Sequence, residues 1–150
     1  MKRVFIAGSK SIKSLSSFQE NEIKQHFTNN NLILLKNNYD IDYELQNLCN
    51  NENYMRVFIF SLLHKPNKTI NKEWHMMFIP PKNNDFENTI NDRIISLCDY
   101  AIVLWDTKSQ EDFSIIIKLI HINKKVILFI ENQIVHINNK EDLHILLKYF

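Results

Sequence analysis

Polar side chains that could do chemistry gather in three segments, each of which follows an apolar run of the sequence. Lysines in these segments could hold an anion, while their carboxylates and hydroxyls could hydrogen-bond a polar ligand. Together the segments would line a polar cleft. The candidate ligand-binding residues are Gly8, Ser9, Lys10, Ser11, Lys36, Asn37, Asp42, Trp105, Asp106, Lys108, Ser109, Glu111 and Asp112.

Several of these residues also have a purely structural interpretation. Gly8 could simply end a strand, and Trp105 could belong to the core. Glu111 and Asp112 would open a helix, where acidic side chains stabilise the helix dipole by about 0.3–1 kcal/mol. The sequence contains no Gly-x-Ser-x-Gly, Walker or Gly-x-Gly-x-x-Gly motif, so the residues alone predict no catalytic residue and no cofactor.

The histidines and cysteines do not have the spacing of metal ligands. None of the six histidines forms a His-x-x-x-His pair. Cys49 and Cys98 stand singly in apolar stretches, without the paired spacing of a zinc site or a disulfide framework. The sequence therefore predicts no metal site and two reduced thiols in the core.

An alternation of strands and helices would position the polar segments. Continuous apolar runs at 4–7, 32–35, 57–60, 101–105 and 126–130 are typical of strands buried on both faces. Amphipathic segments predict helices at 86–97 and 113–122, and others capped by Ser16 or Ser17, by Asp40 or Asp42, and by Asn139. This pattern predicts an α/β fold with a mostly parallel five-stranded sheet and helices on both faces.

The interval 64–85 breaks this rhythm, because it holds all three prolines. We expect an irregular surface segment there, with a short extended piece at 75–79. We also expect a small sixth strand at 134–137, beside the last helix.

Ligands of open parallel sheets bind at the carboxyl ends of the strands, where the strand order reverses. The ends of the first and fourth runs should therefore be neighbours, with Ser9 and Lys10 facing Asp106 and Ser109. Lys10 or Lys108 should then lie within reach of the carboxylates of Asp106, Glu111 or Asp112. Such a pair would be either a ligand clamp or an internal plug.

Composition indicates one globular domain covering residues 1–150. The formal net charge of +1 provides little of the positive potential that nucleic-acid binding needs. No apolar run approaches the roughly 20 residues of a membrane helix, and the N-terminus lacks the pattern of a secretory signal. We therefore expect a cytoplasmic protein without a nucleic-acid or membrane partner. Apolar residues at 115–117, 119 and 120 exceed the needs of one buried helix face, which predicts a homodimer.

Two blocks of the sequence resemble the SLOG superfamily of nucleotide-binding domains. They are Val-Phe-Ile-Ala-Gly-Ser-Lys-Ser-Ile at 4–12 and Cys-Asp-Tyr-Ala-Ile-Val-Leu-Trp-Asp-Thr-Lys-Ser at 98–109. This superfamily contains relatives of the LOG phosphoribohydrolases and is similar to the nucleoside 2-deoxyribosyltransferases. The resemblance implies a Rossmann-like three-layer sandwich, a nucleotide-like ligand over the strand ends and pairing into dimers.

The chain departs from the family pattern where that pattern uses glycine. Thr107 occupies the first glycine position, and Glu111 and Asp112 stand where a Gly-Thr pair would face the ligand. Of the second family motif, after the second strand, only Asp42 matches. Two carboxylates would repel a phosphate, so an ordinary phosphoribohydrolase site is not expected.

Three functions fit this altered pattern. The first is non-catalytic binding of an NAD- or ADP-ribose-derived signal, with Lys10, Lys36 and Lys108 facing the anion. The second is an N-glycosidase or deoxyribosyltransferase-like enzyme that uses Glu111 or Asp112 as nucleophile. The third is a protein-interaction module whose ligand site has decayed. The sequence favours the first.

Overall fold

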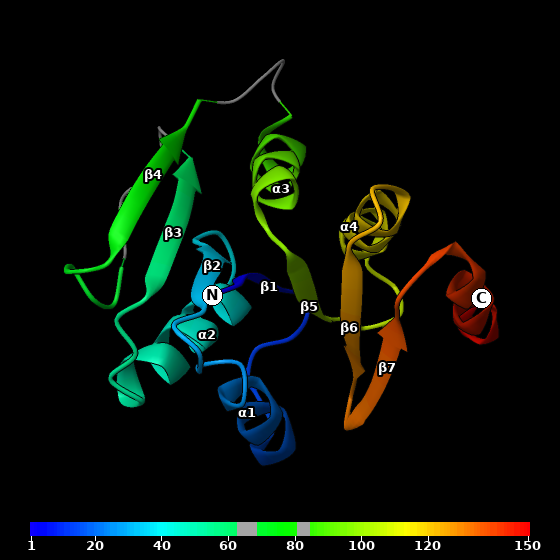
Figure 1. Cartoon of the computed structure of the whole chain (residues 1–150), viewed down its shortest axis with the longest axis horizontal. Coiled ribbons are helices and arrows are strands. Elements are labelled where there is room, and N and C mark those ends of the chain that lie inside the picture. The colour runs from blue at the N-terminus through cyan, green and yellow to red at the C-terminus, as the bar shows by residue number, and fades with distance from the viewer. Residues whose placement is uncertain (63–68, 81–84) are drawn as a thin grey trace.

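The computed structural model describes residues 1–62, 69–80 and 85–150, in which seven strands alternate with five helices (Figure 1). The strands are β1 (Arg3–Gly8), β2 (Leu32–Lys36), β3 (Val57–Leu62), β4 (His75–Ile79), β5 (Tyr100–Leu104), β6 (Lys125–Ile130) and β7 (Gln133–Ile137). The helices are α1 (Ser17–Lys24), α2 (Asp40–Asn51), α3 (Phe86–Leu97), α4 (Gln110–His121) and the 3₁₀ helix η1 (Lys140–Tyr149).

All seven strands form one sheet in the order β4-β3-β2-β1-β5-β6-β7. Neighbouring strands are parallel except β6 and β7, which are antiparallel. The five predicted runs all lie in parallel strands, as expected. Because β1 lies between β2 and β5, the strand order reverses there, and Gly8 pairs with Leu104 where both strands end. The loops after β1 and β5 therefore leave the sheet side by side.

Helices cover both faces of the sheet, which confirms the layered α/β arrangement (Figure 1). On one face, α1 and α2 pack side chains such as Ile41 against Ile6. On the other face, α3 and α4 pack side chains such as Ile94 against Phe5. Ile6 and Phe5 are consecutive residues of β1, and their opposite orientation follows the period of two of an extended strand.

The sheet has seven strands rather than the predicted five, because two edge strands carry a weaker sequence signal. The extended piece expected at His75–Ile79 pairs with β3 along its whole length, and β7 forms a hairpin with β6. In both edge strands only the last residue is buried, so neither shows the continuous apolar run of a central strand. Part of the irregular segment expected at 64–85, namely residues 64–68 and 81–84, lies outside the described residues.

Most of the apolar residues that predicted a homodimer are buried inside the chain. Ile115, Ile116, Leu119 and Ile120 are all buried in the core between α4 and the sheet. The helix begins at Gln110, three residues before the predicted start at Phe113, so its apolar positions fall on a wider buried face than the sequence suggested. Among the described helices, none has the length and apolar character needed to cross a membrane.

Asparagine replaces glycine at most of the left-handed backbone positions. Asn29, Asn30, Asn53 and Asn123 all have positive φ, at turns or just after helices where glycine is usual. Asparagine tolerates this conformation better than other non-glycine residues do. This substitution explains how a chain with one glycine can make so many tight turns.

The two cysteines are buried free thiols, as predicted. Cys49 packs with α2 on one side of the sheet, and Cys98 lies at the end of α3 on the other. Burial raises the pKa of Cys49 to about 12 and that of Cys98 to about 11, so neither thiol is poised to react at neutral pH.

Candidate functional site

The loops after β1 and β5 enclose an open hollow at the point where the strand order reverses. Its volume is about 540 Å³. Its lining residues are Lys10, Ser11, Lys13, Asp106, Lys108 and Ser109. We call it the lysine hollow. Five of these six residues were predicted as ligand-binding from the sequence, and the topology brings them together as expected.

Asp106 occupies a cradle of hydrogen-bond donors beside this hollow. One carboxylate oxygen accepts the backbone N–H groups of Lys108 and Ser109 at 2.8 and 2.7 Å. The other oxygen accepts the Ser11 hydroxyl at 2.6 Å. Burial alone would raise the pKa of Asp106, but these hydrogen bonds outweigh it and hold the pKa below its usual value. The backbone amides that could have cradled a phosphate therefore hold the protein's own carboxylate.

Thr107 adopts the conformation that the glycine of the family pattern would favour. Its φ is +66°, in the left-handed region that β-branched residues rarely enter. The turn after β5 therefore has a glycine-type backbone without a glycine. This strain lies directly beside Asp106, which fits the general location of backbone strain at functional sites.

A second hollow lies next to the lysine hollow and shares Asp106 with it. Its volume is about 450 Å³. Apolar walls come from the loop after β1 and from Trp105, and polar groups come from the turn between β6 and β7. Its lining residues are Ile12, Ser14, Leu15, Ser16, Gln19, Trp105, Asp106, Thr107, Ile130, Glu131 and Asn132. We call it the mixed hollow.

Lys36, at the end of β2, lies in a buried polar network behind the lysine hollow. Its side chain has no solvent exposure, and its ammonium lies 3.4 Å from the Glu111 carboxylate. Glu111 also accepts hydrogen bonds from the Tyr39 hydroxyl at 3.1 Å and from the Asn91 amide at 3.0 Å. The Tyr39 ring in turn lies 5.3 Å from the Lys36 ammonium and 5.8 Å from that of Lys10. Tyr39 thus joins the buried network to the lysine hollow.

Ser9 and Asp112 extend this network under α4. The Ser9 hydroxyl donates to Asp112 at 2.6 Å and accepts the backbone N–H of Asp106 at 3.0 Å. Burial raises the pKa of Asp112 to about 6, although Ser9 and Lys36 oppose the rise. Ser109 rather than an acidic residue caps α4. Glu111 and Asp112 therefore do more than stabilise a helix dipole.

Asp42 is fully buried and points its carboxylate back at the start of α2. One oxygen accepts the backbone N–H groups of Asn38 and Tyr39, both at 2.9 Å. Tyr39, not Asp40 or Asp42, is the N-cap residue, and Asp42 stands three residues into the helix. Burial raises the pKa of Asp42 against the opposing effect of Lys36.

Several buried polar atoms in this region have no hydrogen-bond partner among the described residues. They are Asn37 Nδ2, Asn38 Nδ2 and Oδ1, Asp42 Oδ1, Ser61 Oγ, Asn91 Oδ1 and Asp112 Oδ1. Most surround Lys36 at the ends of β1, β2 and β3, so the inner network is polar but incompletely paired.

The predicted residues thus divide into two groups that the sequence did not separate. Lys10, Ser11, Asp106, Lys108 and Ser109 line the lysine hollow. Ser9, Lys36, Asn37, Asp42, Glu111 and Asp112 belong to the inner network or lie buried beside it. The expected ion pair from Lys10 or Lys108 to a carboxylate does not form among the described residues; Lys36 forms it instead.

Gly8 and Trp105 have packing roles. A Cβ at Gly8 would lie 2.7 Å from the Ile41 side chain, so a close approach of α2 to β1 requires this glycine. Trp105 is buried and stacks with Phe113, with ring centroids 6.0 Å apart, although it also reaches the mixed hollow. The structural interpretation of these two residues is thus supported by their contacts.

Three residues of the site were missed from the sequence, namely Lys13, Tyr39 and Asn91. Asn91 had a usable signal, because it stands beside Ile90 and three residues before Ile94 on the inward face of α3. Lys13 pairs with Asp40 at 3.2 Å, and both side chains are mostly exposed, so this ion pair contributes little stability.

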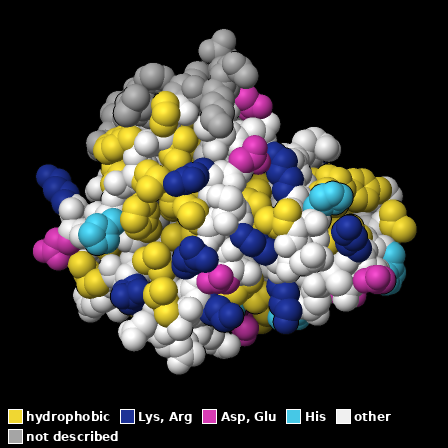
Figure 2. Space-filling model, turned by 45° about the horizontal axis from the view of Figure 1, so that its top comes forward, with side chains coloured by type: hydrophobic (Ala, Val, Ile, Leu, Met, Phe, Trp, Pro, Cys, Tyr) yellow, Lys and Arg dark blue, Asp and Glu magenta, His cyan; other side chains and the backbone are white. Residues whose placement is uncertain are grey.

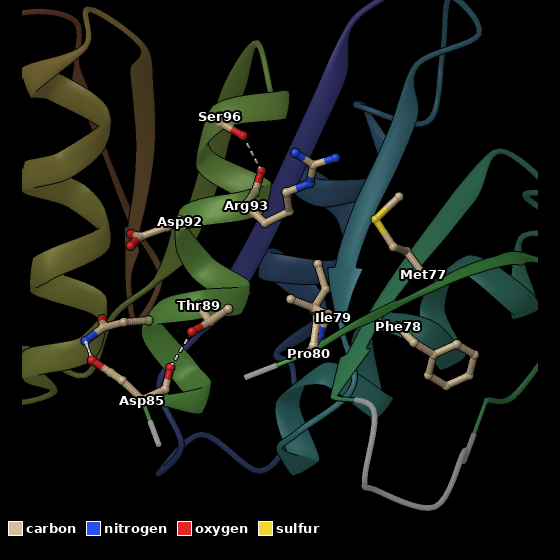
Figure 3. A pocket seen from close by; sticks show the side chains of 10 residues that line it. Met77, Phe78, Ile79, Pro80, Asp85, Thr89, Asp92, Arg93 and Ser96 are labelled. Atoms are coloured by element: carbon tan, nitrogen blue, oxygen red, sulfur yellow. Dashed lines mark hydrogen bonds between the residues drawn. The ribbon is translucent and has the colours of Figure 1, made fainter. Parts of the chain in front are cut away.

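A larger hollow lies elsewhere, between β4 and α3 (Figure 3), with a volume of about 770 Å³. Met77 and Ile79 line one side of it, and α3 lines the other. The hydroxyls on α3 bond within that helix or to its cap: Thr89 donates to the Asp85 carbonyl and Ser96 to the Arg93 carbonyl. Both hydroxyls are thus engaged within α3 or with its cap. The lysine hollow is the better candidate site, because it lies where the strand order reverses and ligands of parallel sheets bind.

On the face drawn in Figure 2, Lys and Arg side chains are interspersed with acidic and uncharged side chains, and no continuous basic patch is seen there. Among the described residues, no group of three or more His, Cys, Asp or Glu side chains could hold a metal ion. Compared with known proteins, the chain matches no family model, no curated protein and no solved structure.

Proposed function

We propose that the protein binds a nucleotide-derived small molecule at the carboxyl ends of β1 and β5 without cleaving it. The observation that supports this most directly is the lysine hollow, in which three lysines gather where ligands of parallel sheets bind. An NAD- or ADP-ribose-derived molecule is the proposed ligand class. Membership of the SLOG superfamily and a cytoplasmic location belong to the same proposal.

The two hollows fit the parts of such a ligand. Lys10 and Lys108 would face the phosphates, and the mixed hollow would take the base. Asp106 is shared by both hollows and would accept the ribose hydroxyls, as acidic residues do in dinucleotide-binding folds. Each hollow lies within the roughly 300–1,000 Å³ that is usual for small-molecule sites.

The contacts of the inner carboxylates favour binding over cleavage. A glycosidase would need Glu111 or Asp112 to reach the ligand as nucleophile. Glu111 is instead held by Lys36, and Asp112 is buried under the Ser9 hydroxyl. Neither carboxylate lines the lysine hollow or the mixed hollow.

Calorimetric titration with ADP-ribose, AMP and adenosine tests the proposal. We expect affinity to fall in that order, because the number of phosphates falls. The double variant Lys10→Ala, Lys108→Ala should weaken ADP-ribose binding tenfold or more, which is about 1.4 kcal/mol. Lys140→Ala removes an exposed charge at the start of η1 and should leave the affinity unchanged.

Two results would redirect the proposal. Equal affinity of the double variant and the unmodified protein would remove the lysine hollow as the site and favour a protein-interaction module. Chromatographic detection of a free base after incubation, lost in Glu111→Gln, would favour the N-glycosidase alternative.

A homodimer is also proposed, now through Ile117 and the exposed Ile122 beside it, and a monomeric mass at micromolar concentration would contradict it.

A further inference from the structure

A further hollow, lined by several hydrogen-bond donors, lies at the opposite end of the strands, where the parallel strands begin. Its volume is about 500 Å³. Its floor is formed by cross-strand partners, because Tyr100 pairs with Lys125 and Ile127 pairs with His136. Partners in register point to the same face of a sheet. The lining residues are Lys2, His26, Asp99, Tyr100, Asn123, Lys125, Ile127, His136 and Asn138.

His26 is fixed in the wall of this hollow just after α1. Its Nδ1 lies 2.7 Å from the Tyr100 hydroxyl, and its backbone carbonyl accepts the Asn31 amide at 3.0 Å. Nδ1 is therefore engaged, which leaves Nε2 as the ring nitrogen that can donate to a ligand. Burial lowers the pKa of His26; His136 lowers it further, while Glu22 opposes both. A bound anion would reverse this balance.

The charges around the hollow favour an anion. Lys2 and Lys125 are exposed cations on its rim. Asp99 is the one carboxylate in the lining, and it is already engaged: it accepts the Arg3 backbone N–H at 2.7 Å and lies 3.5 Å from the Arg3 guanidinium. Burial raises the pKa of the Tyr100 hydroxyl, which therefore keeps its proton. Because one hydrogen bond joins the Tyr100 hydroxyl to Nδ1 of His26, these two residues together offer the ligand one donor while His26 is neutral. The lining can thus offer two ammoniums, this donor, the His136 imidazole and two amides.

We propose that this hollow binds a small organic phosphate, independently of any ligand at the carboxyl ends of the strands. The three terminal oxygens of a phosphate accept more hydrogen bonds than the two oxygens of a carboxylate, which matches the number of donors. The Tyr100 ring and Ile127 provide apolar contact for the organic part. The volume exceeds that of the phosphate group alone and lies within the usual range for small ligands.

An NMR titration that follows the imidazole resonances of His26 and His136 tests the proposal. Ribose 5-phosphate is the ligand, and ribose is the uncharged control. Saturable shifts are expected with ribose 5-phosphate and not with ribose. Lys125→Gln combined with His136→Gln should weaken binding, followed at His26, at least tenfold. Both positions are exposed, so the fold should be retained. Resonances that stay unchanged at millimolar ligand would overturn the proposal.

The double variant Lys10→Ala, Lys108→Ala distinguishes binding at this hollow from binding at the lysine hollow. It should give the same His26 shifts and the same affinity as the unmodified protein. If it instead loses the shifts, the phosphate binds at the lysine hollow and the proposal fails. Absence of ADP-ribose binding to the lysine hollow would leave the His26 result unaffected, so the two proposals can fail separately.

Sulfate gives a test of the role of His26, because it remains a dianion over the whole range in which histidine titrates. Sulfate binding should raise the pKa of His26, and its affinity should increase as the pH falls through that titration. Each unit by which the ligand raises this pKa corresponds to about a tenfold gain in affinity at low pH. A pH-independent affinity for sulfate would contradict the proposal.

Discussion

The lysine hollow and the inner network behind it contain the same residue types in opposite environments. In the hollow, Asp106 is surrounded by donors, and its pKa is lowered. In the network, Asp112 lies six residues further along the chain, and burial raises its pKa to about 6. The lysines differ in the same way, since Lys36 is buried against Glu111 while Lys10 is exposed.

This contrast shows why a lysine after a strand does not by itself indicate a ligand site. A buried ammonium is committed to the carboxylates around it, and its removal leaves them uncompensated. An exposed ammonium at the rim contributes little to stability and remains accessible to an anion. Substitutions in the inner network should therefore change mainly the free energy of unfolding, and substitutions in the lysine hollow should change mainly ligand affinity.

The largest effect is expected from Lys36→Met. The substitution keeps most of the side-chain volume but removes the Lys36 ammonium, which acts on Glu111, Asp42 and Asp112. Breaking a buried ion pair in this way should lower the free energy of unfolding by about 3–5 kcal/mol. Urea denaturation at neutral pH measures the change.

Lys10→Met is the matched control in the lysine hollow. Because Lys10 is exposed, the change should stay within about 0.5 kcal/mol. Equal changes in the free energy of unfolding for the two substitutions would show that the inner network contributes no more to stability than the lysine hollow does.

An opposite pH dependence is expected for Asp112 and Asp106. The raised pKa of Asp112 means that the folded protein holds a proton that the unfolded chain loses, so stability falls as the pH rises from about 4 to about 6. Asp112→Asn cannot ionise. Its stability relative to the unmodified protein should therefore increase by about 2 kcal/mol across this window. Asp42 is present in both proteins, so its own titration cancels.

Asp106→Asn should give a slope of the other sign. The lowered pKa of Asp106 contributes stability above the unfolded-state pKa, and this contribution is lost as the pH falls through the folded-state value. The variant should therefore be less stable than the unmodified protein at neutral pH, and the difference should vanish in acid. Chemical denaturation over a pH series measures both variants, and slopes of the same sign would contradict the comparison.

Much of the fold follows from periodicity in the sequence. The central strands have continuous apolar runs because both faces are covered, and these runs were recognised. The edge strands β4 and β7 have only half-buried patterns, so the sheet was predicted with too few strands. The meeting of the loops after β1 and β5 also followed, because it depends on topology alone.

The division of the site could not be predicted, because it depends on side-chain direction at strand ends. Lys36 is the last residue of β2, and Lys10 stands two residues beyond β1, so a small difference in position decides burial. Tyr39 was also unexpected, because tyrosine is unusual as an N-cap residue. The carboxylate of Asp42 compensates by accepting the Tyr39 backbone N–H. Local sequence patterns do not show which of these side chains are buried or which residues they contact in the folded protein.

A small stabilisation is expected from Thr107→Gly, which tests how the turn beside the lysine hollow is built. A β-branched residue at φ +66° is strained, whereas glycine enters this region without penalty. The greater entropy of glycine in the unfolded chain offsets part of the gain, as does loss of the Thr107 hydroxyl bond to the Asp106 carbonyl at 2.6 Å. We expect a net stabilisation of about 1 kcal/mol, or a rise in Tm of about 2–4 °C for a domain of this size. Thr107→Ala loses the same hydroxyl but keeps a Cβ in the left-handed region, so it should not reproduce the gain. A Tm that falls in Thr107→Gly would mean that the hydroxyl bond, rather than the backbone conformation, determines the stability of the turn that holds Asp106.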